Sequence, residues 1–108
     1  MRVNVTAFAE RQIAATGEYI EQTWGRAHRI KFKQRLRQVI SLLRKNSNMG
    51  AVEPLLMQYA RTYRSIVATT QNKIIYVIDS DQIDIVAFWD VRREPAVLAD
   101  EVIKETNK

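Results

Sequence analysis

The spacing of apolar residues changes once along this chain, and that change limits its possible folds more than any other feature. Between residues 7 and 45 apolar side chains recur every three or four positions, for example at Phe32, Leu36 and Val39. Between residues 63 and 89 they largely alternate with other residues. The first spacing is typical of amphipathic helices and the second of strands. The sequence therefore predicts helices in its first half and a sheet in its second.

Residues that favour caps and turns divide the first half into a short strand and two helices. Residues 2–5 alternate polar and apolar side chains, which predicts a strand. Thr6 is suited to cap the first helix, and Gly25 to end it, because glycine readily adopts the left-handed backbone conformation. The second helix ends in the turn-forming stretch 46–50. Two amphipathic helices joined so tightly should form an antiparallel hairpin.

The second half predicts three consecutive strands and a final helix. Residues 63–68, 73–78 and 83–89 are rich in β-branched and aromatic side chains, and polar turn residues separate them. Pro95 suits the first turn of a final helix. We therefore predict a single α+β domain over residues 1–108, with the order β-α-α-β-β-β-α. A helical hairpin packs on one face of its small, mainly antiparallel four-stranded sheet, and we expect the other face to be open to solvent. The sequence leaves two positions open for the final helix, which either packs on the sheet or swings outward.

The aromatic residues of the first half fall on or beside apolar stripes. We expect them in the core rather than at a base-stacking surface; they are Phe8, Tyr19, Trp24 and Phe32. Trp89 is different, because alternation places it on the open face of the sheet if Phe88 faces the helices. A large exposed aromatic side chain there would mark a contact site for another macromolecule.

Several classes of chemistry lack the residues they need. The chain has no cysteine, and its only histidine, His28, lies far in sequence from any suitable serine and aspartate pair. Asp79, Asp81 and Asp84 lack the glycine and final glutamate of a calcium loop, so we interpret them as turn residues. We expect no metal and no cofactor. The lack of a long apolar run or a leader-like N-terminus favours a cytoplasmic protein without a membrane partner.

The net charge of +5 is concentrated in one part of the chain. Residues 22–52 contain no acid and eight basic residues, which are Arg26, Arg29, Lys31, Lys33, Arg35, Arg37, Arg44 and Lys45. This basic segment therefore has a charge of +8. A local positive field of this strength favours an anionic partner, whether nucleic acid, an acidic protein or a membrane surface.

A second group of basic residues lies on and around the predicted strands. Arg61 and Arg64 point to opposite faces of a regular strand, because its side-chain period is two. On the open face, Arg64 would join Lys73 and the Arg92-Arg93 pair. Arginine binds phosphate or carboxylate through two parallel hydrogen bonds, so this cluster is a candidate anion site. The alternative is an ion-pair network with nearby acidic residues, namely Glu53, Asp90 and Glu94.

Four motifs follow the predicted strand and helical hairpin. In chain order they are Gly50-x-x-Glu53-Pro54-Leu55, Tyr63-Arg64-Ser65-Ile66-Val67, Lys73-Ile74-Ile75-Tyr76 and Phe88-Trp89-Asp90-Val91-Arg92-Arg93-Glu94-Pro95. In this order and spacing they resemble the RelE/ParE superfamily of toxins from bacterial type II toxin-antitoxin systems. The resemblance covers nearly the whole chain. It implies a growth-inhibiting toxin of a plasmid-stabilising kind, with a target that is either ribosome-bound mRNA or DNA gyrase.

One branch of this superfamily cleaves mRNA on the ribosome, and the resemblance implies roles for four residues if this chain is such an endoribonuclease. Glu53 would act as the general base, and Arg64 and Arg92 would bind the scissile phosphate. RNA cleavage through the 2′-hydroxyl also needs an acid for the leaving oxygen. Asp90 stands roughly where the family has a histidine, and it would have to be protonated near pH 7 to serve. The implied catalytic set is therefore incomplete.

The Asp-x-Arg-Arg-x-Pro ending, residues 90–95, resembles more closely the ParE branch. Its members lack that catalytic set and are associated with poisoning DNA gyrase. A binding surface rather than a reaction would then produce the toxic effect, and we favour this branch. The residues that we expect to contact the target, or a phosphate of it, are Arg61, Arg64, Lys73, Trp89, Arg92 and Arg93.

In either branch the resemblance implies a toxin–antitoxin hetero-oligomer, in which an antitoxin wraps the toxin and sets acidic residues against basic ones. Opposite charges speed association, which gives the basic segment a physical role. The residues that we expect to dock the antitoxin are Arg29, Lys33, Arg37, Arg44 and Lys45. The remaining alternative is a stand-alone basic module that binds nucleic acid and is not toxic.

Overall fold

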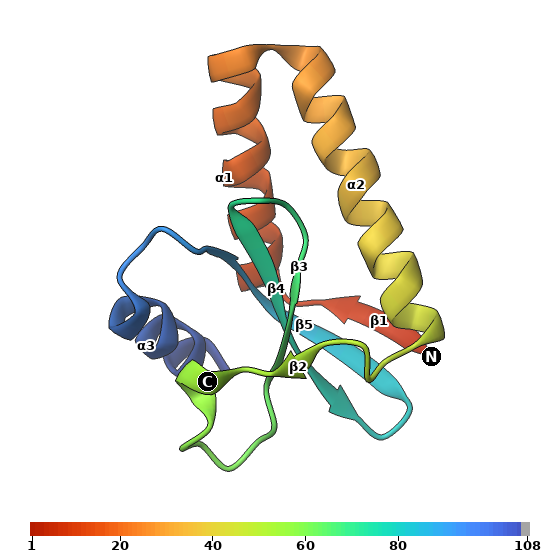
Figure 1. Cartoon of the computed structure of the whole chain (residues 1–108), viewed down its shortest axis with the longest axis vertical. Coiled ribbons are helices and arrows are strands. Elements are labelled where there is room, and N and C mark those ends of the chain that lie inside the picture. The colour runs from red at the N-terminus through yellow and green to blue at the C-terminus, as the bar shows by residue number, and fades with distance from the viewer. Residues whose placement is uncertain (107–108) are drawn as a thin grey trace.

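The computed structural model describes residues 1–106 and has the predicted α+β fold (Figure 1). Its elements, in chain order, are β1 (Arg2–Val5), α1 (Ala7–Trp24), α2 (Arg26–Lys45), β2 (Ala51–Val52), the short 3-10 helix η1 (Pro54–Leu56), β3 (Arg64–Val67), β4 (Asn72–Asp79), β5 (Gln82–Asp90) and α3 (Pro95–Thr106). The sheet has five strands in the order β1-β5-β4-β3-β2, one more than predicted. The additional strand, β2, has only two residues, too few for an alternating pattern.

The strand pairings explain how the two halves of the chain meet. β1 pairs with β5 in parallel, and all other neighbouring strands are antiparallel. The central strands β4 and β5 are therefore flanked on both sides, by β3 and by β1. Within residues 1–106, no helix is both long and apolar enough to cross a lipid bilayer.

The predicted ends of the helical hairpin are confirmed. The Thr6 hydroxyl accepts a hydrogen bond from the Ala9 N–H at 3.2 Å, which caps α1. Gly25 has a φ of 99°, a value that favours glycine, and its N–H donates to the Glu21 carbonyl at 2.8 Å. At this residue the chain leaves α1 and enters α2. The hairpin extends past the end of the sheet, as the upper part of Figure 1 shows.

One hydrophobic core lies between the hairpin and the sheet. The predicted stripe of α2 is buried here, with Phe32, Leu36, Val39 and Leu43 all at most 8% exposed. The sheet contributes side chains from β4 and β5, and the Phe32 and Phe88 rings meet edge to face with centroids 5.8 Å apart. This core fixes α2 against the middle of the sheet.

The prediction that the other face of the sheet is open to solvent was wrong. A second core lies there, in which α3 and η1 cover β4 and β5. Its largest side chain is Trp89, which was expected to be exposed and is 0% exposed. Alternation did place Trp89 opposite Phe88, but α3 packs over it with Leu98, Ala99 and Val102. The continuous apolar run of β4 suits a strand that is buried on both faces.

Gly50 joins the loop after α2 to the sheet. Its N–H donates to the Tyr76 hydroxyl at 3.0 Å, and that hydroxyl donates to the Ser47 carbonyl at 2.8 Å. Burial raises the pKa of Tyr76, so the hydroxyl remains a donor at neutral pH. A Cβ atom at position 50 would lie 2.6 Å from the Tyr76 hydroxyl oxygen and 2.8 Å from the Ser65 carbonyl oxygen. The loop therefore has no room for a side chain at this position.

We predict that Gly50→Ala destabilises the fold, because the added methyl group must displace either the Tyr76 ring or the β3 backbone. The expected loss in the free energy of unfolding is about 1–3 kcal/mol, measured by urea denaturation. The matched control is Asn48→Ala, an exposed change in the same loop that should cost no more than about 0.5 kcal/mol. Equal stability of the two variants would contradict this account of the loop.

Candidate functional site

Arg64 lies on β3 beside a pocket at the edge of the sheet. It is opposite Tyr76 in the β3–β4 register, so its side chain is on the hairpin face. One terminal nitrogen, Nη1, donates to the Gly50 carbonyl at 2.8 Å. The pocket has a volume of about 400 Å³ and includes Arg61, Asn48 and Asp79 in its lining. Arg64 also lines this pocket, and one hydrogen bond holds its guanidinium.

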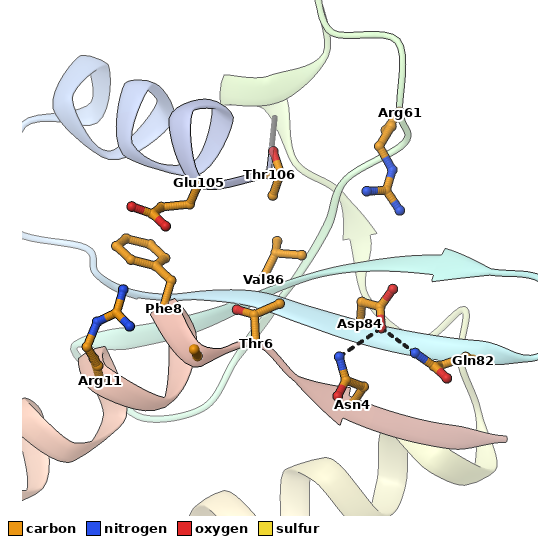
Figure 2. Close-up of a pocket in the computed structure, with 11 residues that line it drawn as sticks. Asn4, Thr6, Phe8, Arg11, Arg61, Gln82, Asp84, Val86, Glu105 and Thr106 are labelled. Atoms are coloured by element: carbon orange, nitrogen blue, oxygen red, sulfur yellow. Dashed lines mark hydrogen bonds between the residues drawn. The ribbon is translucent and has the colours of Figure 1, made fainter. Parts of the chain in front are cut away.

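Arg61 lies in the loop before β3 and borders a second pocket as well, of about 640 Å³ (Figure 2). In Figure 2, Arg61 and Arg11 lie on opposite sides of this pocket. Its lining also includes Asp84, which accepts hydrogen bonds from Asn4 at 3.3 Å and Gln82 at 2.6 Å. Arg61 itself is exposed and makes no hydrogen bond or ion pair with any other residue in 1–106. Its guanidinium is therefore available to a partner.

Glu53 is buried beneath the second core and is not accessible from these pockets. It is 1% exposed and forms an ion pair with Lys73. Its other carboxylate oxygen accepts the Leu55 N–H at 3.0 Å and so caps η1. The Lys73 ammonium nitrogen lies 5.2 Å from the centre of the Trp89 ring, within the range of a cation–π contact. Glu53, Lys73 and Trp89 therefore form one cluster on the α3 face, in which Glu53 and Trp89 are buried and Lys73 is partly buried.

The predicted grouping of Arg64 with Lys73, Arg92 and Arg93 on one open face was wrong. Arg64 is on the hairpin face with Tyr76, whereas Lys73 is paired with Glu53 beside Trp89 on the α3 face. The sheet therefore separates the two cations. The strand register explains this separation. Arg64 is paired with Tyr76 of β4 and shares its face, whereas Lys73 is an odd number of residues from Tyr76 on the same strand and therefore points to the other face.

The arginine pair after β5 is engaged in ion pairs. Arg92 donates to both carboxylate oxygens of Asp90, at 2.9 and 2.7 Å, and this contact lowers the pKa of Asp90 below its ordinary value of 3.8. Asp90 is therefore ionised at neutral pH. Arg93 donates to both carboxylate oxygens of Glu101, at 2.8 and 3.3 Å, and so joins the start of α3 to its middle. Ion pairs, the alternative to an anion site, are therefore present at both arginines. Arg93 pairs with Glu101 instead of the expected Glu94.

The basic residues of the basic segment are exposed except for Arg29, and two of them, Arg29 and Arg35, contact other parts of the chain. Arg29, expected on the antitoxin-docking surface, lies between the helices, where Nη1 is 3.4 Å from Glu21 and Nε is close to Gly17. Arg35, which sequence analysis assigned no role, donates to the Ala68 carbonyl at 2.9 Å. The other expected docking residues are exposed on α2; they are Lys33, Arg37, Arg44 and Lys45.

Two aromatic residues predicted to be in the core are exposed instead. Tyr19 is 54% exposed and Trp24 is 55% exposed, and their rings meet edge to face with centroids 6.0 Å apart. Both belong to the last two turns of α1, which lie in the part of the hairpin that extends past the sheet (Figure 1). The helical spacing identified the correct stripe but could not indicate where the sheet beneath it ends.

A comparison with protein families gives a match over residues 3–95 to the family described as the ParE toxin of the type II toxin-antitoxin system, parDE. The chain belongs to the ParE toxin family. The resemblance to the RelE/ParE superfamily is thereby confirmed. No curated protein sequence matches this ParE-family chain.

Two solved structures share its fold. A chain of the chromosomal ParDE toxin-antitoxin system from P. aeruginosa superimposes with a TM-score of 0.69 at 16% identity, over 83% of this chain and 95% of that one. A chain of the YoeB dimer from Staphylococcus aureus gives a TM-score of 0.52 at 15% identity, over 81% of this chain and 92% of that one. At these identities the likeness concerns the fold.

In this ParE-family chain, the four residues considered for RNA cleavage do not meet at one position. Glu53 and Arg64 are on opposite faces of the sheet, and Asp90 and Arg92 are bonded to each other after β5. Sequence analysis did not predict that Glu53 is buried, although the residue that follows it indicates a structural role. A residue that can accept a hydrogen bond directly before a proline is a typical helix N-cap, and Glu53 caps η1 in this way.

We predict that Lys73→Met is strongly destabilising in this toxin, because it leaves the Glu53 carboxylate buried without its counter-ion. The expected loss is about 3–5 kcal/mol in the free energy of unfolding, measured with chemical denaturant. The double variant Glu53→Gln/Lys73→Met should recover part of this loss, since no charge is left buried. Lys104→Met, on the exposed side of α3, is the control. A double variant no more stable than the single one would contradict the ion-pair account.

Proposed function

We propose that this ParE-family toxin inhibits growth by binding DNA gyrase in the cytoplasm, without cleaving RNA, until an antitoxin neutralises it. The observation that supports binding over catalysis is the separation of Glu53 from Arg64 by the sheet. A general base must reach the 2′-hydroxyl while a cation holds the adjacent phosphate, and these two groups cannot contact one phosphodiester from opposite faces.

The surroundings of Glu53 and Asp90 support the same choice. The Glu53 carboxylate is enclosed by Lys73 and the Leu55 N–H, so an RNA substrate would have to displace a buried ion pair to reach it. Asp90 would have to protonate the leaving oxygen, but Arg92 lowers the pKa of Asp90 and keeps it ionised. Neither residue suits the role that an RNase would require of it.

The target contact in this proposal is made by Arg61 and Arg64, the two arginines that border the 400 Å³ pocket. Arg64 uses Nη1 to hold the Gly50 carbonyl, which orients the guanidinium and leaves its other N–H groups for a partner. Arg61 is exposed and makes no ion pair within residues 1–106. Two arginines arranged in this way suit a carboxylate or phosphate on the target. Trp89 is buried in the second core and Lys73 is paired with Glu53, so neither takes part in this contact.

The antitoxin in this proposal is an acidic protein that forms a hetero-oligomer with the toxin. The exposed cations of α2 supply the complementary charge, in particular Lys33, Arg37, Arg44 and Lys45. Such a field raises the association rate and makes it sensitive to salt.

The test uses purified toxin in two assays, supercoiling by gyrase and cleavage of ribosome-bound mRNA. We predict that the toxin inhibits supercoiling and leaves the mRNA intact. Arg61→Ala should weaken the inhibition about tenfold or more, since it removes charge-assisted hydrogen bonds. Lys104→Ala, which removes an exposed cation from α3, is the matched control and should have no effect.

Two other outcomes would contradict this proposal, and each would favour a different function. Cleaved mRNA with unaffected gyrase would replace this proposal by the RNase alternative. Normal growth of a bacterial host that contains the folded toxin would remove toxicity altogether and favour a basic nucleic-acid-binding module.

A further inference from the structure

The pocket in Figure 2 lies beside the pairing of β1 with β5, on the α3 side of the sheet. Its lining comes from β1, β5, the first turns of α1, the loop before β3 and the end of α3. Its volume of about 640 Å³ is within the range of sites that hold small organic ligands. We name it the β1–β5 pocket. Arg61 is the one member of this lining that the proposed target contact uses.

Asp84 is held in the β1–β5 pocket with one carboxylate oxygen unused. Its Oδ1 accepts hydrogen bonds from the side-chain amides of Asn4 at 3.3 Å and Gln82 at 2.6 Å. Gln82 is itself held, because its side-chain oxygen accepts from Arg2 at 2.9 Å. The other carboxylate oxygen, Oδ2, accepts no hydrogen bond within residues 1–106, and Figure 2 shows it pointing toward the side on which Arg61 lies. The network therefore presents an oriented acceptor to the pocket.

The charges that line the β1–β5 pocket cancel. Its cations are Arg11 and Arg61, both exposed and both without a hydrogen bond or ion pair to the rest of residues 1–106. Its acids are Asp84 and Glu105. A balanced lining suits a ligand that has one anionic group and a separate donor edge. It does not suit a nucleic-acid strand, which needs a positive groove along its row of phosphates.

The two ends of the pocket differ in what they offer a ligand. Arg61 and Asp84 lie at one end, where they provide hydrogen-bond donors beside an acceptor and form no ion pair with each other (Figure 2). Arg11 lies at the other end together with the ring of Phe8, and Val86 lies between the two ends. An arginine beside an aromatic ring suits a phosphate that is joined to an organic group.

We propose that the β1–β5 pocket binds a guanine nucleotide with a single phosphate group, with the base edge at Arg61 and Asp84 and the phosphate at Arg11. A carboxylate has about four acceptor positions, and the two on Oδ1 are filled, so two remain on Oδ2. Guanine presents two adjacent donors, N1–H and N2–H, beside the acceptor O6, which Arg61 can contact. The other bases present a single N–H donor group at this edge and would leave one position empty.

The first test measures nucleotide binding to the purified full-length toxin by isothermal titration calorimetry. We expect guanosine 5′-monophosphate (GMP) to bind at one site. Guanosine lacks the phosphate and inosine 5′-monophosphate (IMP) lacks the N2 amino group. Each should bind at least tenfold more weakly than GMP, because each loses a hydrogen bond to a charged side chain.

Two variants connect these losses to particular side chains. Arg11→Ala should weaken GMP binding at least tenfold and leave guanosine binding unchanged, since guanosine has no phosphate to lose. Asp84→Asn keeps an oxygen for the amides of Asn4 and Gln82 but turns the unused oxygen into a donor. It should weaken GMP binding at least tenfold and abolish the preference for GMP over IMP. The matched controls, Lys104→Ala and Asp81→Asn, remove exposed charges outside the pocket and should change neither value.

Several outcomes would overturn the inference. One is a lack of GMP binding up to about 1 mM. Another is equal affinity for GMP and inorganic phosphate, which would reduce the pocket to a simple anion site. Equal affinity for GMP and adenosine 5′-monophosphate would contradict the role of Asp84. Tighter binding of a single-stranded oligonucleotide, weakened by the same variants, would assign the pocket to a nucleic-acid strand instead.

The proposed function is tested separately, because Arg11 and Asp84 do not line the 400 Å³ pocket. Gyrase inhibition by Arg11→Ala and by Asp84→Asn should equal that of the unchanged toxin. If both variants lose GMP binding and retain inhibition, both proposals are supported. If both variants retain GMP binding, the inference fails and the proposed function remains.

Discussion

The burial of β4 and β5 on both faces is the constraint on which the rest of this structure depends. These two strands contribute most of the large buried side chains of the sheet. On β4, even-numbered residues such as Ile74 and Tyr76 lie under the hairpin and odd-numbered ones such as Ile75 and Val77 lie under α3. Each face needs its own cover, because apolar side chains on a bare face would remain in water. The hairpin and α3 are therefore both required, and they hold the loops around the sheet in place.

Alternation along the same strands also decides which polar groups can meet. A shift of one residue moves a side chain to the opposite face, so Arg64 and Lys73 are separated although they lie on neighbouring strands. Lys73 then pairs with Glu53 in the second core, where an ion pair is tolerated because both charges have partners. Glu53, one of the four residues of the implied catalytic set, has in this way become part of the packing on the α3 side of the sheet. What remains accessible near β3 is a pair of arginines, Arg61 and Arg64, whose pocket includes Asp79 but not Glu53.

The fold could largely be predicted from the sequence, because its signals are local. Thr6 and Gly25 bound α1 through contacts within one turn, and the strands show their own alternation. The site could not be predicted to the same extent, because it depends on contacts between distant residues. Glu53 and Lys73 are 20 residues apart and meet only through the β2–β3–β4 register. The exposure of Tyr19 likewise depends on where the sheet ends, which no pattern within α1 contains.

The exposed aromatic residues of the hairpin and the accessible arginines lie at opposite ends of β4. The pocket beside Tyr19 and Trp24 includes Asn72, the first residue of β4, whereas the pocket of Arg61 and Arg64 includes Asp79, its last. Seven steps of about 3.3 Å place these ends roughly 23 Å apart. A single partner segment that covers both places must therefore span at least about seven extended residues.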